Sequence, residues 1–137
     1  MKRLGWLLLL LATSFAQAAG LEIQGIRLWA APDNTRVEFD VSGPAVHRLF
    51  SLKAPDRLVI DLDNARIGEQ ARNSQSSAGM VTGLRSGQRN KDDLRVVLDL
   101  SRPAKAKSFV LKPNDQYGHR LVVDLFDSAA AAKTAPR

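Results

Sequence analysis

The residue types that carry out catalysis are scarce in this sequence. Its 137 residues include two histidines, His47 and His119, and no cysteine. A hydrolytic zinc site takes three protein ligands, usually rich in histidine. Serine chemistry needs a Ser–His–Asp arrangement, and the sequence contains no nucleophile-elbow pattern and no glycine-rich phosphate-binding motif. We therefore expect both histidines to be ordinary surface residues in a non-catalytic chain that uses no metal ion and no cofactor.

Arginine and aspartate form the second chemical group, and they recur in an ordered repeat. "RVEFDVSGPA" at residues 36–45 matches "RVVLDLSRPA" at residues 95–104. "IQGIR" at 23–27 matches "VTGLR" at 81–85, and "RLVIDL" at 57–62 matches "RLVVDL" at 120–125. Three matched blocks in the same order predict an internal duplication, with repeat halves at about residues 21–63 and 80–127.

Each matched block alternates between apolar and polar residues. In the first block, Val37, Phe39 and Val41 alternate with polar side chains, which predicts a strand with one apolar face. Residues 46–52 and 107–111 alternate less regularly and are also expected to be strands. Gly25 and Gly83 stand where the alternation slips, which indicates bulges or a close backbone approach. Residues 65–79 are polar and are expected to form a loop with a short helical turn.

Each half thus offers about four strands with an apolar face to bury. Two such faces are buried together when the sheets pack against each other. The expected fold is an all-β sandwich of two symmetric, roughly four-stranded sheets, one copy against the other. Strand order and the exchange of strands between sheets stay open. The expected core residues are Phe39, Ile60, Leu98 and Val123.

The polar positions of the repeat are candidates for binding. They form either cross-strand ion pairs on a solvated face or a lattice that binds carboxylates. Arg27 and Arg85 stand out, because each follows a Gly–aliphatic pair in a strand expected to be buried, and guanidinium groups bind carboxylates bidentately. Trp29 and Tyr117 are candidate platforms for a sugar ring, or else pack at the edge of the core. The full set is Arg27, Arg36, Arg57, Arg85, Arg95, Arg120, Asp61, Asp124, Trp29 and Tyr117.

The N-terminal residues predict export of the protein. Lys2 and Arg3 precede a short apolar run, and small residues at Ala16 and Ala18 favour cleavage before Ala19. The run is too short for a membrane span of about 20 residues. We expect a signal peptide at residues 1–18, a domain at 19–127, a linker or tail at 128–137, and no stable membrane insertion after cleavage.

The charge of the exported chain narrows the class of partner. Removing Lys2 and Arg3 lowers the formal charge from +6 to +4, because residues 1–18 contain no acidic side chain. Export makes nucleic acid an unsuitable partner, so the positive charge favours an anionic polymer outside the cytoplasm. Without cysteine, the domain depends on its apolar core rather than on disulfides.

The stretch from Leu21 to about Asp127 resembles the AMIN domain, and "PDRLVIDL" and "YGHRLVVDLFD" are most similar to its amidase branch. That module is found at the N-terminus of periplasmic N-acetylmuramoyl-L-alanine amidases and in type IV pilus secretins. The resemblance implies a pair of symmetric four-stranded sheets. It also implies a non-catalytic module that binds peptidoglycan and directs its amidase to the division septum, with septal proteins as further partners.

The resemblance does not extend to a catalytic domain. The zinc amidase domain of the family has no counterpart in these 137 residues, so the activity of a parent enzyme is not assigned to this chain. The alternative function is a periplasmic protein–protein docking domain of a type IV pilus secretin, or a free-standing adaptor.

Overall fold

The structure is a computed structural model that describes residues 20–128. The expected signal peptide and residues 129–137 of the expected tail lie outside the described residues. A 3-10 helical turn, η1, covers Ala71–Asn73, and no helix in residues 20–128 is long and apolar enough to cross a membrane. The strands of the described region are β1 (Leu21–Ala30), β2 (Thr35–Val41), β3 (His47–Leu52), β4 (Arg57–Leu62), β5 (Ala65–Ile67), β6 (Val81–Arg89), β7 (Asp93–Leu100), β8 (Ala104–Leu111) and β9 (His119–Asp127).

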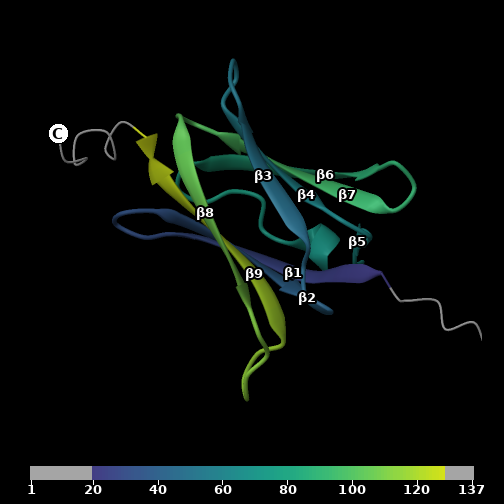
Figure 1. The fold of residues 1–137 in the computed structure, drawn as a ribbon. Helices are drawn as coiled ribbons and strands as arrows, with labels where there is room; N and C mark the ends of the chain where they lie inside the picture. The colour runs from purple at the N-terminus through teal and green to yellow at the C-terminus, as the bar shows by residue number, and fades with distance from the viewer. Residues whose placement is uncertain (1–19, 129–137) are drawn as a thin grey trace, which may run out of the picture.

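These strands form two sheets that pack face to face, which confirms the all-β sandwich (Figure 1). Sheet A has five strands in the order β5-β1-β2-β9-β8, and sheet B has four in the order β3-β4-β7-β6. Neighbouring strands are antiparallel except for β1 and β5, which are parallel. Figure 1 shows the edge strands β3 and β8 side by side at the front of the view, where His47 of β3 contacts Ser108 of β8.

Each sheet takes two neighbouring strands from each half of the repeat, so a simple sandwich of one copy per sheet is wrong. Exchanging every strand for its counterpart converts the order β1-β2-β9-β8 into β6-β7-β4-β3, which is the order of sheet B. Within the two halves the chain changes sheet at residues 42–46 and 101–103, and between the halves it changes at 63–64 and 68–80, on either side of β5. The connections within the halves contain Pro44 and Pro103, and proline has no N–H with which to continue a ladder. The matching order agrees with a duplication, whose common ancestry stays a prediction.

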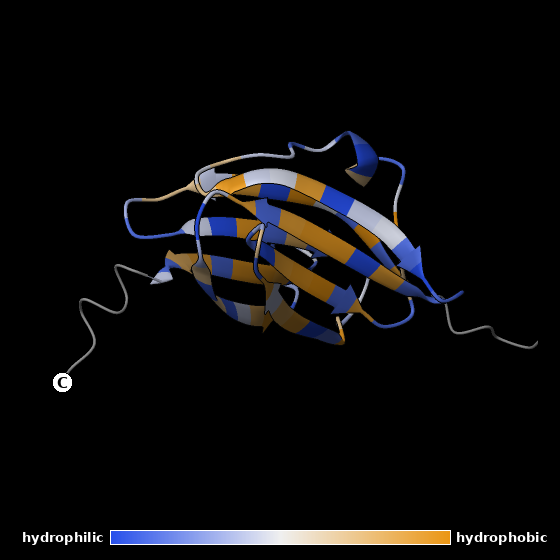
Figure 2. Cartoon of the chain, turned by 90° about the horizontal axis from the view of Figure 1, so that it is seen from above, coloured by the Kyte–Doolittle hydropathy of each residue, from blue (hydrophilic) through white to orange (hydrophobic). Residues whose placement is uncertain are grey.

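The core lies between the two inner faces. Phe39, Ile60, Leu98 and Val123 have no exposed surface, which confirms the expected core residues. Figure 2 shows the apolar and polar positions alternating along the strands. Because the two halves contribute to both sheets, this one core supports both outer faces.

Two bulges and a short strand complete the fold. The register shifts between Ile23 and Gly25 in β1 and between Val81 and Gly83 in β6, which confirms a bulge at each expected position. A Cβ at Gly25 would lie 3.3 Å from an Asp40 carboxylate oxygen, so the glycine leaves room for that side chain. The helical turn expected in residues 65–79 is present as η1. Strand β5 was not expected there, because a run of three residues is too short to show alternation.

Candidate functional site on the outer faces of the sheets

The polar positions of the repeat lie on the outer faces of the sandwich. We call the outer face of sheet A face A and the outer face of sheet B face B. On face A, Arg36 stands opposite Asp124 in the register of β2 and β9. On face B, Arg95 stands opposite Asp61 in the register of β4 and β7. The strand exchange thus places a guanidinium of one half beside a carboxylate of the other half on each face.

Face A is organised around the buried carboxylate of Glu38, which is only 5% exposed. Arg27 Nη2 donates to Glu38 Oε1 at 2.8 Å and to Asp40 Oδ1 at 2.9 Å. Arg120 Nη1 donates to the same Glu38 oxygen at 3.1 Å. A buried charge is costly unless it is paired, and here two guanidinium groups pair with it.

The loop between β8 and β9 adds an aromatic ring to this cluster. The Tyr117 ring centroid lies 5.4 Å from Arg27 Cζ and 4.6 Å from Arg120 Cζ, within the range of cation–π contacts. Asn114 Oδ1 accepts hydrogen bonds from the backbone N–H groups of Gln116 and Tyr117, at 2.9 and 2.8 Å. The loop that the second half carries as an insertion therefore has a defined shape that positions Tyr117.

The matched Arg–Asp pairs are both bidentate. Arg36 Nε and Nη2 donate to Asp124 at 2.7 and 2.9 Å, and this hydrogen bonding raises the pKa of Arg36. Arg95 Nε and Nη2 donate to Asp61 at 2.8 and 3.0 Å, and Arg89 Nη1 adds a third bond at 2.9 Å. The hydrogen bonds from Arg95 lower the pKa of Asp61, and burial opposes that effect. Both carboxylates are buried and hold their arginines in fixed orientations.

Face B has an apolar strip where face A has Glu38. Val97 stands between Arg85 and Val59 in the cross-strand register, as Glu38 stands between Arg27 and Val122 on face A. Val59 is 1% exposed although it points away from the core. The neighbouring Phe50 ring lies 5.4 Å from the Arg95 guanidinium carbon. Aromatic and guanidinium groups thus cover the strip from outside.

The remaining candidate arginines of face B are Arg85, which is exposed, and Arg57, which is half-buried. Arg85 donates two hydrogen bonds to Asp99, at 3.1 and 2.9 Å, and its side chain is 62% exposed. Arg57 Nε donates to the Pro55 carbonyl oxygen at 3.2 Å, and Arg57 has no carboxylate partner among residues 20–128. Arg57 is therefore the candidate arginine with no ion pair in the described part of the chain.

The structure confirms the cross-strand ion-pair interpretation for most candidate arginines. The five that pair with a carboxylate of this chain are Arg27, Arg36, Arg85, Arg95 and Arg120. The expectation that Arg85 lies in a buried strand is wrong, because β6 is an edge strand in which only Val81 is fully buried. Trp29 and Tyr117 are 40% and 42% exposed. The acidic partners Glu38, Asp40 and Asp99 were not among the candidates, although the alternation places them on the polar side.

Neither histidine belongs to a group of side chains that could hold a metal ion in the described part of the chain. His47 is partly exposed, and its Nε2 lies 2.8 Å from Ser108 Oγ and links β3 to β8, a contact that the sequence did not predict. Burial lowers the pKa of His47. Within residues 20–128, no group of three His, Cys, Asp or Glu side chains is placed to hold a metal ion.

Comparison with known proteins shows which family the chain is similar to. The model of the AMIN domain matches residues 25–125. The N-acetylmuramoyl-L-alanine amidase AmiC of Neisseria meningitidis serogroup B is 31% identical over 104 residues, which cover 73% of this chain and 25% of the amidase. The protein of the same name from Escherichia coli O6:H1 is 26% identical over 130 residues, which cover 92% of this chain and 31% of the amidase. The chain spans less than a third of either relative. Because the family model matches most of its length, the chain belongs to the AMIN domain family.

Proposed function

We propose that this chain is a non-catalytic module that binds peptidoglycan and directs a periplasmic cell-wall amidase to the division septum. The observation that carries the proposal is the AMIN domain match over residues 25–125. Two relatives are N-acetylmuramoyl-L-alanine amidases, whose name specifies a bond of the cell wall between muramic acid and L-alanine. The residues of this chain similar to them make up a β-sandwich whose polar groups lie on outer faces rather than in an enclosed reaction centre.

The proposed binding surface consists of face A and face B. Peptidoglycan stem peptides carry carboxylates, and a guanidinium group recognises a carboxylate through two parallel hydrogen bonds. On face B, Arg85 is the more accessible candidate at 62% side-chain exposure, and Arg57 is half-buried with no ion pair among the described residues. On face A, Arg27 is 41% exposed and would exchange part of its internal bonding for a wall carboxylate.

The other candidate residues support this surface. Asp61 and Asp124 hold Arg95 and Arg36 in fixed orientations, which lowers the entropy lost when a ligand binds. Arg120 binds Glu38 under the Tyr117 ring. Trp29 and Tyr117 are exposed aromatic rings of face A, with Phe109 as a third, against which a sugar ring would pack.

Export places this surface in contact with the wall. We propose that residues 1–18 are a cleaved signal peptide, that residues 19–127 form the module in the periplasm, and that residues 128–137 are a linker or tail. The remaining formal charge of +4 attracts an anionic polymer over a distance that depends on salt.

The experiment that tests wall binding is co-sedimentation of the purified mature chain with insoluble peptidoglycan sacculi. We expect the chain to sediment with sacculi without hydrolysing them. Binding should weaken with salt, because the Debye length falls from about 10 Å at 0.1 M to about 3 Å at 1 M. A parent chain that stays in the supernatant at low salt contradicts the proposal.

A double variant tests the arginines separately from wall binding. Arg27→Ala with Arg85→Ala should weaken sedimentation while thermal unfolding shows a folded sandwich. Lysine at both positions should restore binding only in part, because an ammonium group lacks the bidentate geometry of a guanidinium. A double alanine variant that binds as well as the parent would exclude these two residues and leave wall binding intact.

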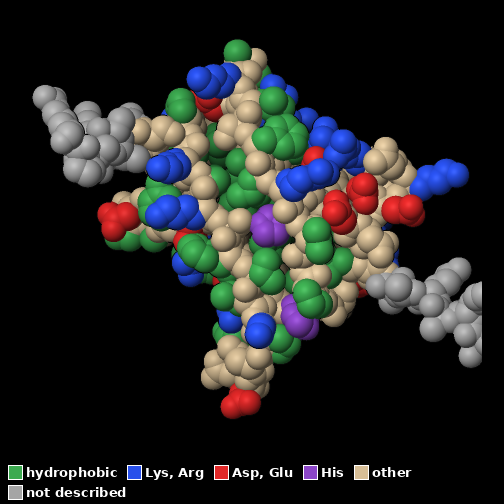
Figure 3. Space-filling model, viewed as in Figure 1, with side chains coloured by type: hydrophobic (Ala, Val, Ile, Leu, Met, Phe, Trp, Pro, Cys, Tyr) green, Lys and Arg blue, Asp and Glu red, His purple; other side chains and the backbone are tan. Residues whose placement is uncertain are grey.

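One observation favours a second function, docking to another envelope protein such as a septal protein or a pilus secretin. The edge strands β3 and β8 expose apolar side chains, with Phe50 at 40%, Phe109 at 46% and Val110 at 45%. Figure 3 shows hydrophobic side chains gathered at the centre of the side where β3 and β8 lie, with basic groups around them. Failure of the parent chain to sediment with sacculi would favour this function.

A further inference from the structure

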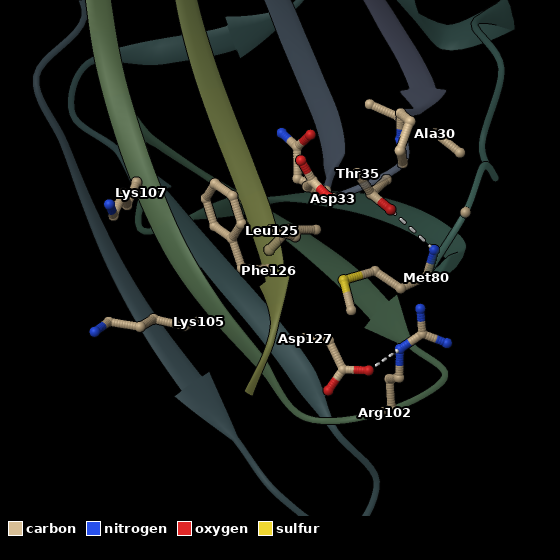
Figure 4. Close-up of a pocket in the computed structure, with 14 residues that line it drawn as sticks. Ala30, Asp33, Thr35, Met80, Arg102, Lys105, Lys107, Leu125, Phe126 and Asp127 are labelled. Atoms are coloured by element: carbon tan, nitrogen blue, oxygen red, sulfur yellow. Dashed lines mark hydrogen bonds and ion pairs between the residues drawn. The ribbon is translucent and has the colours of Figure 1, made fainter. Parts of the chain in front are cut away.

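A pocket of about 590 Å³ opens at one end of sheet A, and none of the candidate residues discussed above lines it (Figure 4). One wall belongs to face A and carries Lys105 and Lys107 of β8 with Phe126 of β9. The opposite wall is the turn between β1 and β2, with Asp33 and Asn34. The volume falls within the range of about 300–1,000 Å³ that is common for small-molecule sites.

The walls of this end pocket are held in place by the chain itself. The backbone N–H of Ala31 donates to the Asn34 carbonyl oxygen at 2.8 Å and closes the turn. The backbone N–H of Met80 donates to Thr35 Oγ1 at 3.1 Å, and this hydroxyl is buried. Arg102 Nε lies 2.9 Å from Asp127 Oδ2 across the base of the pocket (Figure 4). A ligand would therefore meet a largely preformed site.

The two lysines differ from the arginines of face A in having no ion pair among residues 20–128. Lys107 stands opposite Asp124 in the register of β8 and β9, but both oxygens of Asp124 accept hydrogen bonds from Arg36. Lys105 and Lys107 are two residues apart on one strand, so their side chains point to the same side. They place two ammonium groups at one wall, with Lys107 Nζ 5.6 Å from the Phe126 ring centroid.

The other groups of the pocket suit a sugar. The Asp33 carboxylate, which has no ion pair in the described part of the chain, and the Asn34 amide are positioned to hydrogen-bond hydroxyl and acetamido groups. The Phe126 ring offers an apolar surface for the face of a sugar ring. Lys105 and Lys107 extend away from Asp33 in Figure 4, so their ammonium groups would meet an anionic group at the other end of the same ligand.

We propose that the end pocket binds a saccharide that carries a free carboxylate, with Lys105 and Lys107 at the carboxylate and Asp33 and Asn34 at the hydroxyl and acetamido groups. This inference rests on the proposed function, since N-acetylmuramic acid is the cell-wall sugar that carries a carboxyl group. In intact peptidoglycan its lactyl carboxyl group is bound in an amide. Hydrolysis of that amide consumes water, breaks the C–N bond, and yields the sugar carboxylate and the peptide amine. The pocket therefore favours glycan whose peptides an amide hydrolase has removed.

A pair of matched sugars tests the proposal. The labelled mature chain is titrated with N-acetylmuramic acid or with N-acetylglucosamine, which has the same ring and acetamido group but no carboxylate, and amide NMR shifts are recorded. N-Acetylmuramic acid should shift the amide signals of residues 33–34, 105–107 and 126. N-Acetylglucosamine should bind more weakly. Lys105→Ala with Lys107→Ala should lower the affinity about tenfold, the effect of losing a charge-assisted hydrogen bond. Arginine at both positions should retain most of it.

Lys112→Ala is the matched control, because Lys112 follows β8, has no ion pair among residues 20–128, and does not line the pocket. It should leave the affinity unchanged. Edge lysines also discourage unwanted strand pairing. If that is their whole role, the double alanine variant will bind N-acetylmuramic acid like the parent, and the proposal is overturned. Equal binding of the two sugars, or shifts confined to other regions, would overturn it too.

Sedimentation separates this inference from the function on which it rests. Sacculi are compared before and after complete amidase digestion, with the parent chain and the Lys105→Ala, Lys107→Ala variant. We expect digestion to increase binding of the parent, and the double variant to lose only that increase. If digestion does not change binding of the parent chain, the proposed ligand of the end pocket is wrong and wall binding is unaffected. Sedimentation with digested sacculi alone would support the pocket and contradict binding of the intact wall.

Discussion

On face A and on face B, outward-facing residues of neighbouring strands line up in matching rows across the sheet. The central rows differ at one position. The row at the centre of face A is Arg27, Glu38, Val122 and Phe109, and the matching row of face B is Arg85, Val97, Val59 and Phe50. The first, third and fourth positions hold identical side chains, namely Arg, Val and Phe. The second position holds a carboxylate on face A and a valine on face B.

That one position accounts for the different bonding of the arginines. Glu38 is buried and needs cationic partners, so it binds Arg27 and Arg120 at once. Val97 needs no partner, and Arg57, which matches Arg120 in the repeat, has no carboxylate among the described residues. Two faces with the same repeated pattern can thus pair all these arginines with carboxylates on one face and leave one without an ion pair on the other.

The largest effect should come from the core that both faces share. Ile60 lies under face B and Val123 at the matching place under face A, both with no exposed surface. Ile60→Ala should lower the free energy of unfolding by about 2–5 kcal/mol, because it leaves a cavity. Val123→Ala, which removes fewer carbons, should cost less. Urea unfolding should show one transition for both variants. A loss below about 0.5 kcal/mol for Ile60→Ala, as at surface positions, would contradict the facing of β4.

The next effect concerns the matched carboxylates of the two faces. Asp61 accepts three hydrogen bonds from arginines and Asp124 accepts two. Asp61→Asn should therefore destabilise the domain by about 1–3 kcal/mol, and Asp124→Asn by less. Urea unfolding at pH 7 measures both losses, and equal losses would contradict the ranking.

The pH dependence of the Asp61 effect has a definite sign. Hydrogen bonds from Arg95 lower the pKa of Asp61 in the folded state. The stabilisation is complete above the unfolded pKa of about 3.9 and is lost as the pH falls through the lower folded value. The difference between the parent and Asp61→Asn should therefore shrink as the pH falls below about 4. A difference that grows on acidification would contradict the assignment.

A pair of exchange variants would convert each face toward the other. Glu38→Val releases Arg120 and leaves Arg27 with Asp40 alone, so it should raise the affinity for sacculi about two- to fivefold, the equivalent of one exposed ion pair. Val97→Glu gives Arg85 and Arg57 a competing carboxylate and should lower the affinity by a similar factor. Co-sedimentation at two salt concentrations measures both, with thermal unfolding as the control for folding. Changes in the same direction for both variants would show that the arginines do not bind the wall.

Sequence reasoning found the parts of this fold that local patterns encode. The alternation around Phe39 and Ile60 identified strands and core, and the slips at Gly25 and Gly83 identified bulges. Alternation carries no information about which strand lies alongside, so the exchange of strands between sheets was left open. The double pairing of Glu38 depends on that exchange, because Arg120 belongs to the other half of the chain. The end pocket was missed for the same reason, since its walls come from four distant segments.

The smallest effect should come from the hydrogen bond that links the two sheets at their edges. His47 of β3 in sheet B bonds to Ser108 of β8 in sheet A at 2.8 Å. The site is half-buried, so Ser108→Ala should cost about 0.5 kcal/mol, the low end for a hydrogen bond. Burial lowers the pKa of His47 below its unfolded value of about 6.5. The neutral imidazole is thus favoured in the folded state, and this contribution is present above about pH 6.5 and lost as the pH falls through the folded pKa. Urea unfolding of the parent and of His47→Gln should therefore give a stability difference that declines from pH 7.5 to pH 5. A difference that is constant or rises on acidification would show that His47 does not titrate as a half-buried link between sheet A and sheet B.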